Sequence, residues 1–384
     1  MQQKGRENHI IYRLLVWLAG PFLRLFFRFR PEKRELDGPT LVVCNHVTNW
    51  DPLLLAICFP KNHIHFVASE HLFRLGFISS VIRYICDPIP RRKATTAADT
   101  AMACLRKLRQ GNSVAIFVEG ECTWNGITAD VVPSTGRMTK MSKATLLTCC
   151  LEGGYLTAPR WGKGIRPGKM TGRIVGTYSP EQLKEMTPEQ IEALVRRDIH
   201  TDIWENQRHA PVRYRSRRRA ENLQTVLYLC PQCCRVGSLT SRGKHLSCSC
   251  GARWEFTEFG NFAPAQPFQT IAQWDAWQKE ALARQYASGM LTLRDENITV
   301  SRLESDHRQI DLPPAALTLQ KDVLCCGELQ WKLSEIDDLA LVLSRSLLLS
   351  TGSDYYQLKA AKSCSLRKYL TAWEAARAQQ NCEV

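Results

Sequence analysis

His46 and Asp51 are the two residues of this chain whose types and spacing point most directly to catalysis. They lie between two apolar runs, residues 41–44 and 53–57, which predict a buried strand, a polar turn and a helix that opens at Asp51-Pro52. An imidazole that a carboxylate holds can work as a general base at neutral pH. The pair therefore predicts an enzyme that deprotonates a hydroxyl, with a plain helix-capping role for Asp51 as the alternative.

Asn45, His46, Asp51 and Pro52, directly after a predicted buried strand, together resemble the first motif of the glycerolipid acyltransferases. This is the lysophospholipid (1-acylglycerol-3-phosphate) acyltransferase family. The resemblance covers roughly residues 35 to 210. It implies an acyltransferase-type α/β fold and the transfer of an acyl group to a hydroxyl.

Residues 113–120 resemble a strand that ends in the family's third motif, Phe-Pro-Glu-Gly-Thr-Arg. Three positions match, at Phe117, Glu119 and Gly120. The other three differ, because Val118, Glu121 and Cys122 stand in place of the proline, the threonine and the arginine. In the family this motif contacts the glycerol-phosphate end of the acceptor. The resemblance therefore implies that Glu119 and Gly120 bind substrate.

Two weaker matches occupy the intervals where the family's second and fourth motifs should lie. Asp87-Pro-Ile-Pro-Arg91 resembles the second motif, and Arg91 can take its phosphate-binding position. Residues 156–161 resemble the fourth motif, an apolar strand around Pro159. A phosphate on the acceptor needs cationic donors, for which Arg91 and its neighbour Arg92 are candidates. A solvated basic turn is the alternative role for either arginine.

The sequence also indicates how the acyl group moves. No Gly-x-Ser-x-Gly nucleophile elbow is present, so the sequence supports no covalent acyl-enzyme. The hydroxyl of the acceptor is then the attacking group, His46 takes its proton, and Asp51 orients the ring and stabilises the imidazolium. The expected donor is a thioester, either acyl-CoA or acyl carrier protein.

Composition and the N-terminal segment predict a membrane-surface protein. The chain has 51 Lys and Arg against 37 Asp and Glu, and its net charge of +14 favours anionic partners such as phospholipid headgroups. Residues 10–27 are strongly apolar but contain Arg13 and Arg24, and Gly20-Pro21 interrupts them. We therefore expect two short interfacial helices on the cytoplasmic face of the membrane, peripheral or monotopic. A helix pair packed on the catalytic domain is the alternative.

Four of the sixteen cysteines form a metal-binding pattern. Cys230 and Cys233 are separated from Cys248 and Cys250 by a polar turn, as in a zinc ribbon with two knuckles. Four thiolates leave no open position, so the pattern predicts a structural Zn²⁺. Cys234 is a spare thiol beside the first knuckle. Metal is favoured over disulfides because the chain lacks secretory features.

The motifs divide the chain into five segments. Residues 1–34 are membrane-proximal, residues 35–210 form the α/β acyltransferase domain, and residues 211–227 are an arginine-rich linker. Residues 228–260 are the ribbon. In residues 261–384, short strands and a closing helix predict a β-rich domain that resembles a pleckstrin-homology-like fold.

Two classes of function stay open at this point. The first is a membrane-associated O-acyltransferase for a lysophospholipid such as 1-acylglycerol-3-phosphate, or for a different lipid alcohol. The second is a zinc-ribbon nucleic-acid-binding protein, suggested by the net charge and the arginine run. The enzyme interpretation accounts for the first 160 residues, whereas the binding interpretation accounts only for the ribbon and the linker. The expected partners are therefore membrane phospholipids and an acyl donor, without nucleic acid.

Overall fold

The computed structural model describes residues 2–69, 77–91, 97–303, 309–342, 344–352, 354–360 and 364–383. Arg92, a predicted phosphate ligand, lies outside these ranges. The chain divides into two compact units. The first ends at Arg215, and the second contains the short stretch 161–163 and the chain from Ser216 onward.

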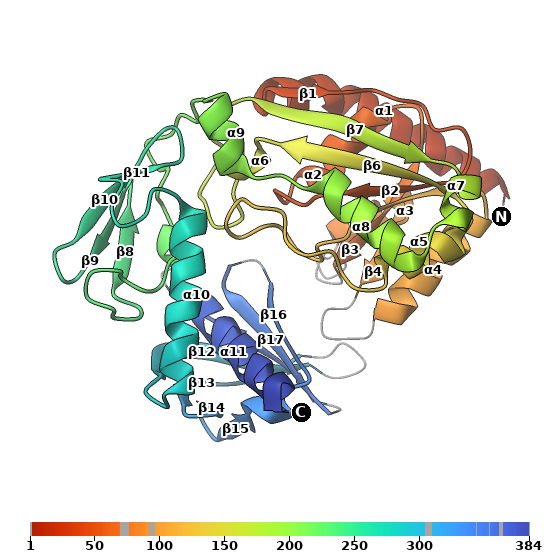
Figure 1. Cartoon of the computed structure of the whole chain (residues 1–384). Helices are drawn as coiled ribbons and strands as arrows, with labels where there is room; N and C mark the ends of the chain where they lie inside the picture. Colours follow the sequence, from red (N-terminus) through yellow and green to blue (C-terminus); the bar gives the residue numbers. More distant parts are fainter. Residues whose placement is uncertain are drawn as a thin grey trace. The chain divides into compact units, whose positions relative to one another are not determined.

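The first unit is built on a sheet to which the described residues contribute seven strands, in the order β1-β7-β6-β2-β5-β3-β4 (Figure 1). Strands β2 to β6 run parallel to one another where they pair, whereas β7 is antiparallel to β6. The central strand β2 is buried along its whole length, as expected for a parallel strand that is covered on both faces. The strands are β1 (Phe29–Pro31), β2 (Thr40–Cys44), β3 (Ile64–Ser69), β4 (Ile89–Arg91), β5 (Ser113–Phe117), β6 (Thr145–Glu152) and β7 (Met170–Tyr178).

Helices cover both faces of this sheet (Figure 1). Alternate residues of β2 belong to two different hydrophobic clusters. Val42 and Cys44 pack with α1 and α2. Leu41 and Val43 pack with α4 and α8. This alternation is the two-residue period of a strand. The helices are α1 (Gln2–Phe26), α2 (Asp51–Cys58), α3 (Phe77–Cys86), α4 (Ala97–Arg109), α5 (Thr135–Ser142), α6 (Gly154–Thr157), α7 (Pro180–Glu185), α8 (Pro188–Ile199) and α9 (Ile203–His209).

The N-terminal segment differs from its prediction. One helix, α1, runs through Gly20 and Pro21, where the sequence predicts two short helices. Proline removes one backbone hydrogen bond from a helix. Buried residues on both sides of this site, Tyr12 before it and Leu23 and Phe27 after it, anchor the helix and outweigh that loss. Among the described residues, no helix is long and apolar enough to cross a membrane.

The second unit contains two antiparallel sheets and two long helices (Figure 1). The described strands follow the orders β11-β10-β9-β8 and β15-β14-β13-β12-β18-β17-β16. Arg367 of α11 and Asp275 of α10 form a buried ion pair that joins the two helices. The elements are β8 (Leu239–Arg242), β9 (His245–Cys248), β10 (Arg253–Phe256), β11 (Phe262–Ala263), α10 (Ile271–Ala287), β12 (Thr292–Leu303), β13 (Gln309–Gln320), β14 (Val323–Cys326), β15 (Leu329–Lys332), β16 (Asp338–Val342), β17 (Ser346–Thr351), β18 (Asp354–Lys359) and α11 (Arg367–Glu383).

The larger sheet and α11 match the predicted strands and closing helix, whereas a pleckstrin-homology-like identity stays a prediction. The segment predicted as a linker is partly packed. Tyr214, Ala220 and Leu223 are buried, whereas four of its arginines, at positions 213, 215, 217 and 218, are exposed. The guanidinium of Arg219 donates hydrogen bonds to the carbonyl of Ser216 and to the carboxylate of Glu255. Arg219 is therefore a structural residue of the second unit.

Candidate active site

His46 lies in the turn between β2 and α2, as the sequence predicts. The Nδ1 atom of its ring is 2.8 Å from Oδ2 of Asp51. The same carboxylate oxygen accepts hydrogen bonds from the backbone amides of Val47, at 2.6 Å, and Thr48, at 2.9 Å. Asp51 is fully buried, and Trp50 occupies the cap position of α2. Asp51 therefore holds the turn and the imidazole, and the alternative of a plain helix cap does not describe its contacts.

The contact with Asp51 sets the orientation of the imidazole. When the Nδ1–H group donates a hydrogen bond to the carboxylate, Nε2 is left as the nitrogen that can accept a proton. Phe117, the last residue of β5, stacks against the ring at a centroid distance of 4.3 Å. About 18% of the His46 side chain is exposed. The ring is thus rigidly held, and part of it can be reached from outside.

Sheet pairing brings the turn after β2 next to the loop after β5. These neighbouring parallel strands end together, because Cys44 pairs with Phe117. The backbone amide of Thr123 donates a 2.8 Å hydrogen bond to the carbonyl of His46. The backbone amide of His46 donates a 2.5 Å hydrogen bond to Oε1 of Glu119. The loop of the third motif therefore holds the backbone of His46 on both sides.

Glu119, predicted to bind substrate, has both carboxylate oxygens engaged inside the protein. Oε2 accepts a 2.6 Å hydrogen bond from the amide of Ala129, and Oε1 accepts the bond from His46. Burial raises the pKa of Glu119 to about 7, and the two amides oppose part of this effect. In this geometry Glu119 supports His46, while its contact with substrate stays a prediction.

We expect the substitution Glu119→Gln to remove a pH dependence of stability. A carboxyl whose pKa is raised in the folded state stabilises the protein below its unfolded pKa, and this contribution is lost as the pH rises through about 7. The stability advantage of the wild type over the variant should therefore shrink by about 3 kcal/mol between pH 4 and pH 8. Denaturant unfolding at both pH values measures it, and a pH-independent difference would contradict the raised pKa.

Arg91 and Gly120, also predicted to bind substrate, lie against each other. Gly120 has a positive φ of 79°, and a Cβ atom added there would lie 3.1 Å from Nη1 of Arg91. Glycine suits both the backbone conformation and the close approach of the guanidinium. The structure thus brings Arg91 to the third-motif loop that holds His46.

Comparison with known proteins gives a family match over part of the chain. Residues 27–152 match the family model described as Acyltransferase. These residues form an acyltransferase domain. The crystal structure of the 1-acyl-sn-glycerophosphate (LPA) acyltransferase PlsC from Thermotoga maritima is similar to this chain, with 18% sequence identity and a TM-score of 0.43. The similarity covers 52% of this chain and 80% of that one. A search of curated proteins gave no match.

The family match confirms the resemblance read from the motifs. Sequence reasoning missed two residues of this region, namely Cys122, inside the matched residues 27–152, and Arg160, which follows them. Cys122, noted only as a replacement for the motif arginine, places its Sγ atom 3.3 Å from Nε2 of His46. Arg160 lies within the segment that resembles the fourth motif. Its Nη1 atom is 2.8 Å from a carboxylate oxygen of Glu121 and 2.8 Å from the carbonyl oxygen of Cys122. The sequence offered a signal for Cys122, namely the departure from the motif.

The neighbours of His46 shift the pKa of its ring upward. Burial of the ring opposes its protonation. The charge interaction with Cys122, and the hydrogen bonds to Asp51 and Cys122, outweigh burial and raise the pKa of His46 to about 10. These contacts favour the protonated ring over the neutral ring.

The second unit gathers the four predicted metal ligands. The sulfur atoms of Cys230, Cys233, Cys248 and Cys250 all lie within 4.8 Å of one another. The separations between Cys230 and Cys250, 3.9 Å, and between Cys233 and Cys248, 3.7 Å, suit a tetrahedral ion. A Zn–S bond of about 2.3 Å gives sulfur atoms about 3.8 Å apart in that geometry. The exposed Cys234 is not a member of this cluster.

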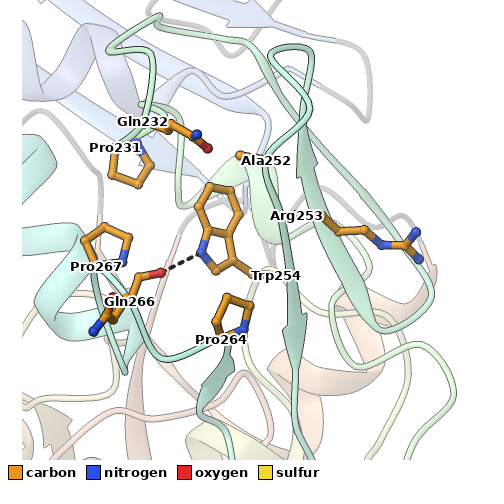
Figure 2. A pocket seen from close by; sticks show the side chains of 8 residues that line it. All are labelled: Pro231, Gln232, Ala252, Arg253, Trp254, Pro264, Gln266 and Pro267. Carbon is orange, nitrogen blue, oxygen red and sulfur yellow. Dashed lines mark hydrogen bonds between the residues drawn. The ribbon is translucent and has the colours of Figure 1, made fainter.

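A pocket in the second unit lies beside the first knuckle (Figure 2). Trp254 forms its wall, and its indole Nε1 donates a 3.0 Å hydrogen bond to the carbonyl of Gln266. Figure 2 shows the guanidinium of Arg253 pointing away from the other labelled side chains. The lining residues are Pro231, Gln232, Ala252, Arg253, Trp254, Pro264, Gln266 and Pro267. This set contains no carboxylate, histidine or cysteine, so it supplies neither a nucleophile nor a general base.

Proposed function

We propose that this chain is a membrane-surface O-acyltransferase that moves a fatty acyl group from a thioester donor to the hydroxyl of a lysophospholipid. The donor is acyl-CoA or acyl carrier protein, and 1-acylglycerol-3-phosphate is the first acceptor to test. The observation that carries the proposal is the His46–Asp51 pair, held by the third-motif loop inside an acyltransferase domain. A different lipid alcohol is the alternative acceptor.

In this proposal His46 accepts the proton of the acceptor hydroxyl as that oxygen attacks the acyl carbonyl. Asp51 keeps Nδ1 protonated and stabilises the imidazolium that forms. Arg91, next to Gly120, supplies a cationic donor for the phosphate of the acceptor. The hydroxyl and the phosphate of the acceptor then each have a protein group of suitable chemistry.

The exposed face of α1 supports a membrane-surface location. This face carries large apolar side chains at helical spacing, among which Trp17 is 71% exposed and Leu25 is 81% exposed. Exposed arginines accompany them, at positions 13, 24, 28 and 30. An apolar stripe flanked by basic residues suits the interface of an anionic membrane. The stripe consists of Ile10, Leu14, Trp17, Leu18, Phe22 and Leu25.

The proposed function is tested by incubating the purified chain with an acyl-CoA and lysophosphatidate presented on phospholipid vesicles. We expect phosphatidate to form, and free thiol to be released in equal amount. Acyl carrier protein donors and acceptors without phosphate extend the same assay. Failure to acylate any of these acceptors would overturn the proposal. Binding of nucleic acid by the inactive protein would then favour the second class of function.

Arg91→Ala is expected to raise the KM for a phosphorylated acceptor by about 10- to 100-fold, because a charge-assisted hydrogen bond contributes about 1.5–3 kcal/mol. The KM for the acyl donor should change little. Steady-state kinetics with each substrate varied in turn measures both values. Arg137→Ala, at an exposed site on α5, is the matched control that removes one positive charge. Equal effects on donor and acceptor would argue that Arg91 has only a surface role.

Trp17→Glu is expected to weaken binding to anionic phospholipid vesicles by about 10- to 100-fold, because burial of one large apolar side chain contributes about 1.5–3 kcal/mol. Vesicle sedimentation measures the bound fraction. Met290→Glu is the matched control, since Met290 is 74% exposed in the second unit and the substitution adds the same charge. Unchanged binding of the Trp17 variant would count against an interfacial role for α1.

The same proposal includes one structural Zn²⁺ held by Cys230, Cys233, Cys248 and Cys250. The donor set fits this ion, because zinc prefers thiolates in tetrahedral geometry. The backbone amide of Arg235 lowers the pKa of Cys233 to about 6, which favours the thiolate that a metal needs. Four protein ligands leave no position for substrate, so the ion would stabilise the fold and take no part in acyl transfer.

A further inference from the structure

The small sheet of the second unit has one buried face and one exposed face. Strands β8, β9 and β10 pair antiparallel, and Ser247 lies opposite Thr240 on one side and opposite Arg253 on the other. The alternate residues Leu246 and Trp254 are buried, as expected for a sheet that is covered on one side only. The other face consists of Thr240, Arg242, His245, Ser247, Arg253 and Glu255.

Two arginines stand on this face of the sheet. Arg242 ends β8 and Arg253 begins β10, and both are exposed. Figure 2 shows the guanidinium of Arg253 pointing away from the residues of the pocket. The short side chains of Thr240 and Ser247 lie beside these arginines, so they leave the two guanidinium groups accessible from solvent.

Two further arginines reach the sheet from the arginine-rich segment. The amide of Ala220 donates a 2.9 Å hydrogen bond to the carbonyl of Gly243, in the turn between β8 and β9. A Cβ atom added to Gly243 would lie 3.4 Å from the carbonyl oxygen of Arg217. The exposed Arg217 and Arg218 therefore stand beside this turn. We call Arg217, Arg218, Arg242 and Arg253 the four sheet arginines.

The charge on this face is predominantly positive. Its acidic residue, Glu255, forms ion pairs with Lys244, at 2.9 Å, and with Arg219. No described residue forms a hydrogen bond or an ion pair with the guanidinium groups of the four sheet arginines. Burial lowers the pKa of His245, and the positive charges of Arg253 and Lys244 lower it further. The face therefore suits an anionic partner.

We propose that this face binds the anionic phospholipid surface of a membrane through the four sheet arginines. This inference rests on the proposed membrane-surface function and gives the second unit a membrane contact of its own. That contact is electrostatic, whereas the contact proposed for α1 is largely apolar. Clusters of basic residues bind anionic membranes in this way.

The exposed face fits a membrane better than it fits a single-stranded nucleic acid. Proteins that bind single strands without sequence preference stack the bases on aromatic rings. The indole of Trp254 and the phenyl ring of Phe256 belong to the buried face of this sheet. Phospholipid headgroups need no stacking platform, and long arginine side chains can extend to phosphates on a flat surface.

The proposal is tested by sedimenting the full-length protein with phosphatidylcholine vesicles that do or do not contain phosphatidylglycerol. The test variant combines Arg217→Gln, Arg218→Gln, Arg242→Gln and Arg253→Gln. Its affinity for the anionic vesicles should fall by about 100- to 1,000-fold, because each basic residue near such a surface contributes about fivefold. The wild type and the variant should bind pure phosphatidylcholine equally. Unchanged affinity for the anionic vesicles would overturn the proposal.

A control variant of equal charge separates this face from net charge. It replaces four exposed basic residues of the second unit that lie outside the small sheet, and it should lose at most about threefold in affinity, because salt screens distant charges. An equal loss in this control would overturn the assignment to the face. The replaced residues are Arg284, Lys321, Lys332 and Lys359.

Two half variants keep the result interpretable if the fourfold variant folds poorly. One changes Arg217 and Arg218 to glutamine, and the other changes Arg242 and Arg253. Each should lose about 10- to 30-fold in affinity for anionic vesicles, and circular dichroism establishes that each is folded. Wild-type affinity in both folded half variants would overturn the proposal.

Salt and a competing polyanion test the nature of the contact. Raising the salt concentration should abolish the difference between the wild type and the fourfold variant, because screening weakens contacts between exposed charges. A difference that salt leaves unchanged would overturn the electrostatic contact. Single-stranded RNA that binds more tightly than anionic vesicles, and only when the four sheet arginines are present, would favour nucleic acid and overturn the membrane as partner.

An activity assay separates this inference from the proposed function. The fourfold variant should acylate a short-chain, water-soluble lysophosphatidate at the wild-type rate, because the four sheet arginines belong to the second unit and His46 to the first. Absence of acyl transfer by the wild type would count against the proposed function. The vesicle measurements would still decide whether the face binds an anionic membrane.

Discussion

His46→Ala is expected to reduce acyl transfer by at least about 10²- to 10⁴-fold, because general acid–base assistance is lost. The fold should persist, since the contacts of Asp51 with the amides of Val47 and Thr48 do not involve the ring. Initial rates with saturating donor and acceptor measure the effect.

Two further variants serve as a control and as a second test of the His46–Asp51 pair. His209→Ala, at an exposed site near the end of α9, is the matched control and should keep wild-type activity. Asp51→Asn should also impair activity severely, because an amide group cannot accept all the hydrogen bonds that Oδ2 of Asp51 accepts. Turnover close to the wild-type rate by folded His46→Ala protein would refute the proposed mechanism.

Removal of zinc is expected to have the largest effect on stability. Structural zinc sites in small modules bind with about 10–16 kcal/mol of apparent free energy, and this binding energy is folding energy. We expect about one zinc ion per chain by metal analysis. A strong chelator should unfold the second unit, which calorimetry or limited proteolysis would detect. The cluster contributes no group to the His46 site, so chelation removes no catalytic side chain.

Matched cysteine variants test the ligand set. Cys248→Ser should lose the ion, whereas Cys234→Ser should keep it, because only Cys248 belongs to the cluster. Metal content near zero that zinc supplementation does not change would refute the site. Zinc retained by the Cys248 variant would show that the ligand set is wrong, and Cys234 would become the next candidate.

Local patterns account for the parts of this protein that could be predicted. The apolar run of β2, the polar turn and the Asp51-Pro52 start of α2 follow from residue types within about fifteen positions. The metal ligands were likewise predicted from their spacing, because each knuckle places its two cysteines through local backbone geometry. The prediction of two N-terminal helices also rested on local residue types, namely Gly20 and Pro21. It was wrong because buried residues on both sides of Pro21 hold α1 as one helix.

The sequence by itself determined the His46–Asp51 pair, the acyltransferase resemblance and the cysteine set. Only the tertiary structure decided what surrounds His46. Strands β2 and β5 are parallel neighbours whose ends coincide, so the segments that follow them meet although about 75 residues separate them. Because of this pairing, Glu119 accepts a hydrogen bond from the backbone amide of His46, and the thiol of Cys122 lies against the ring. Residue types along the chain do not specify strand order, and for that reason the thiol–imidazole contact became visible only in the folded sheet.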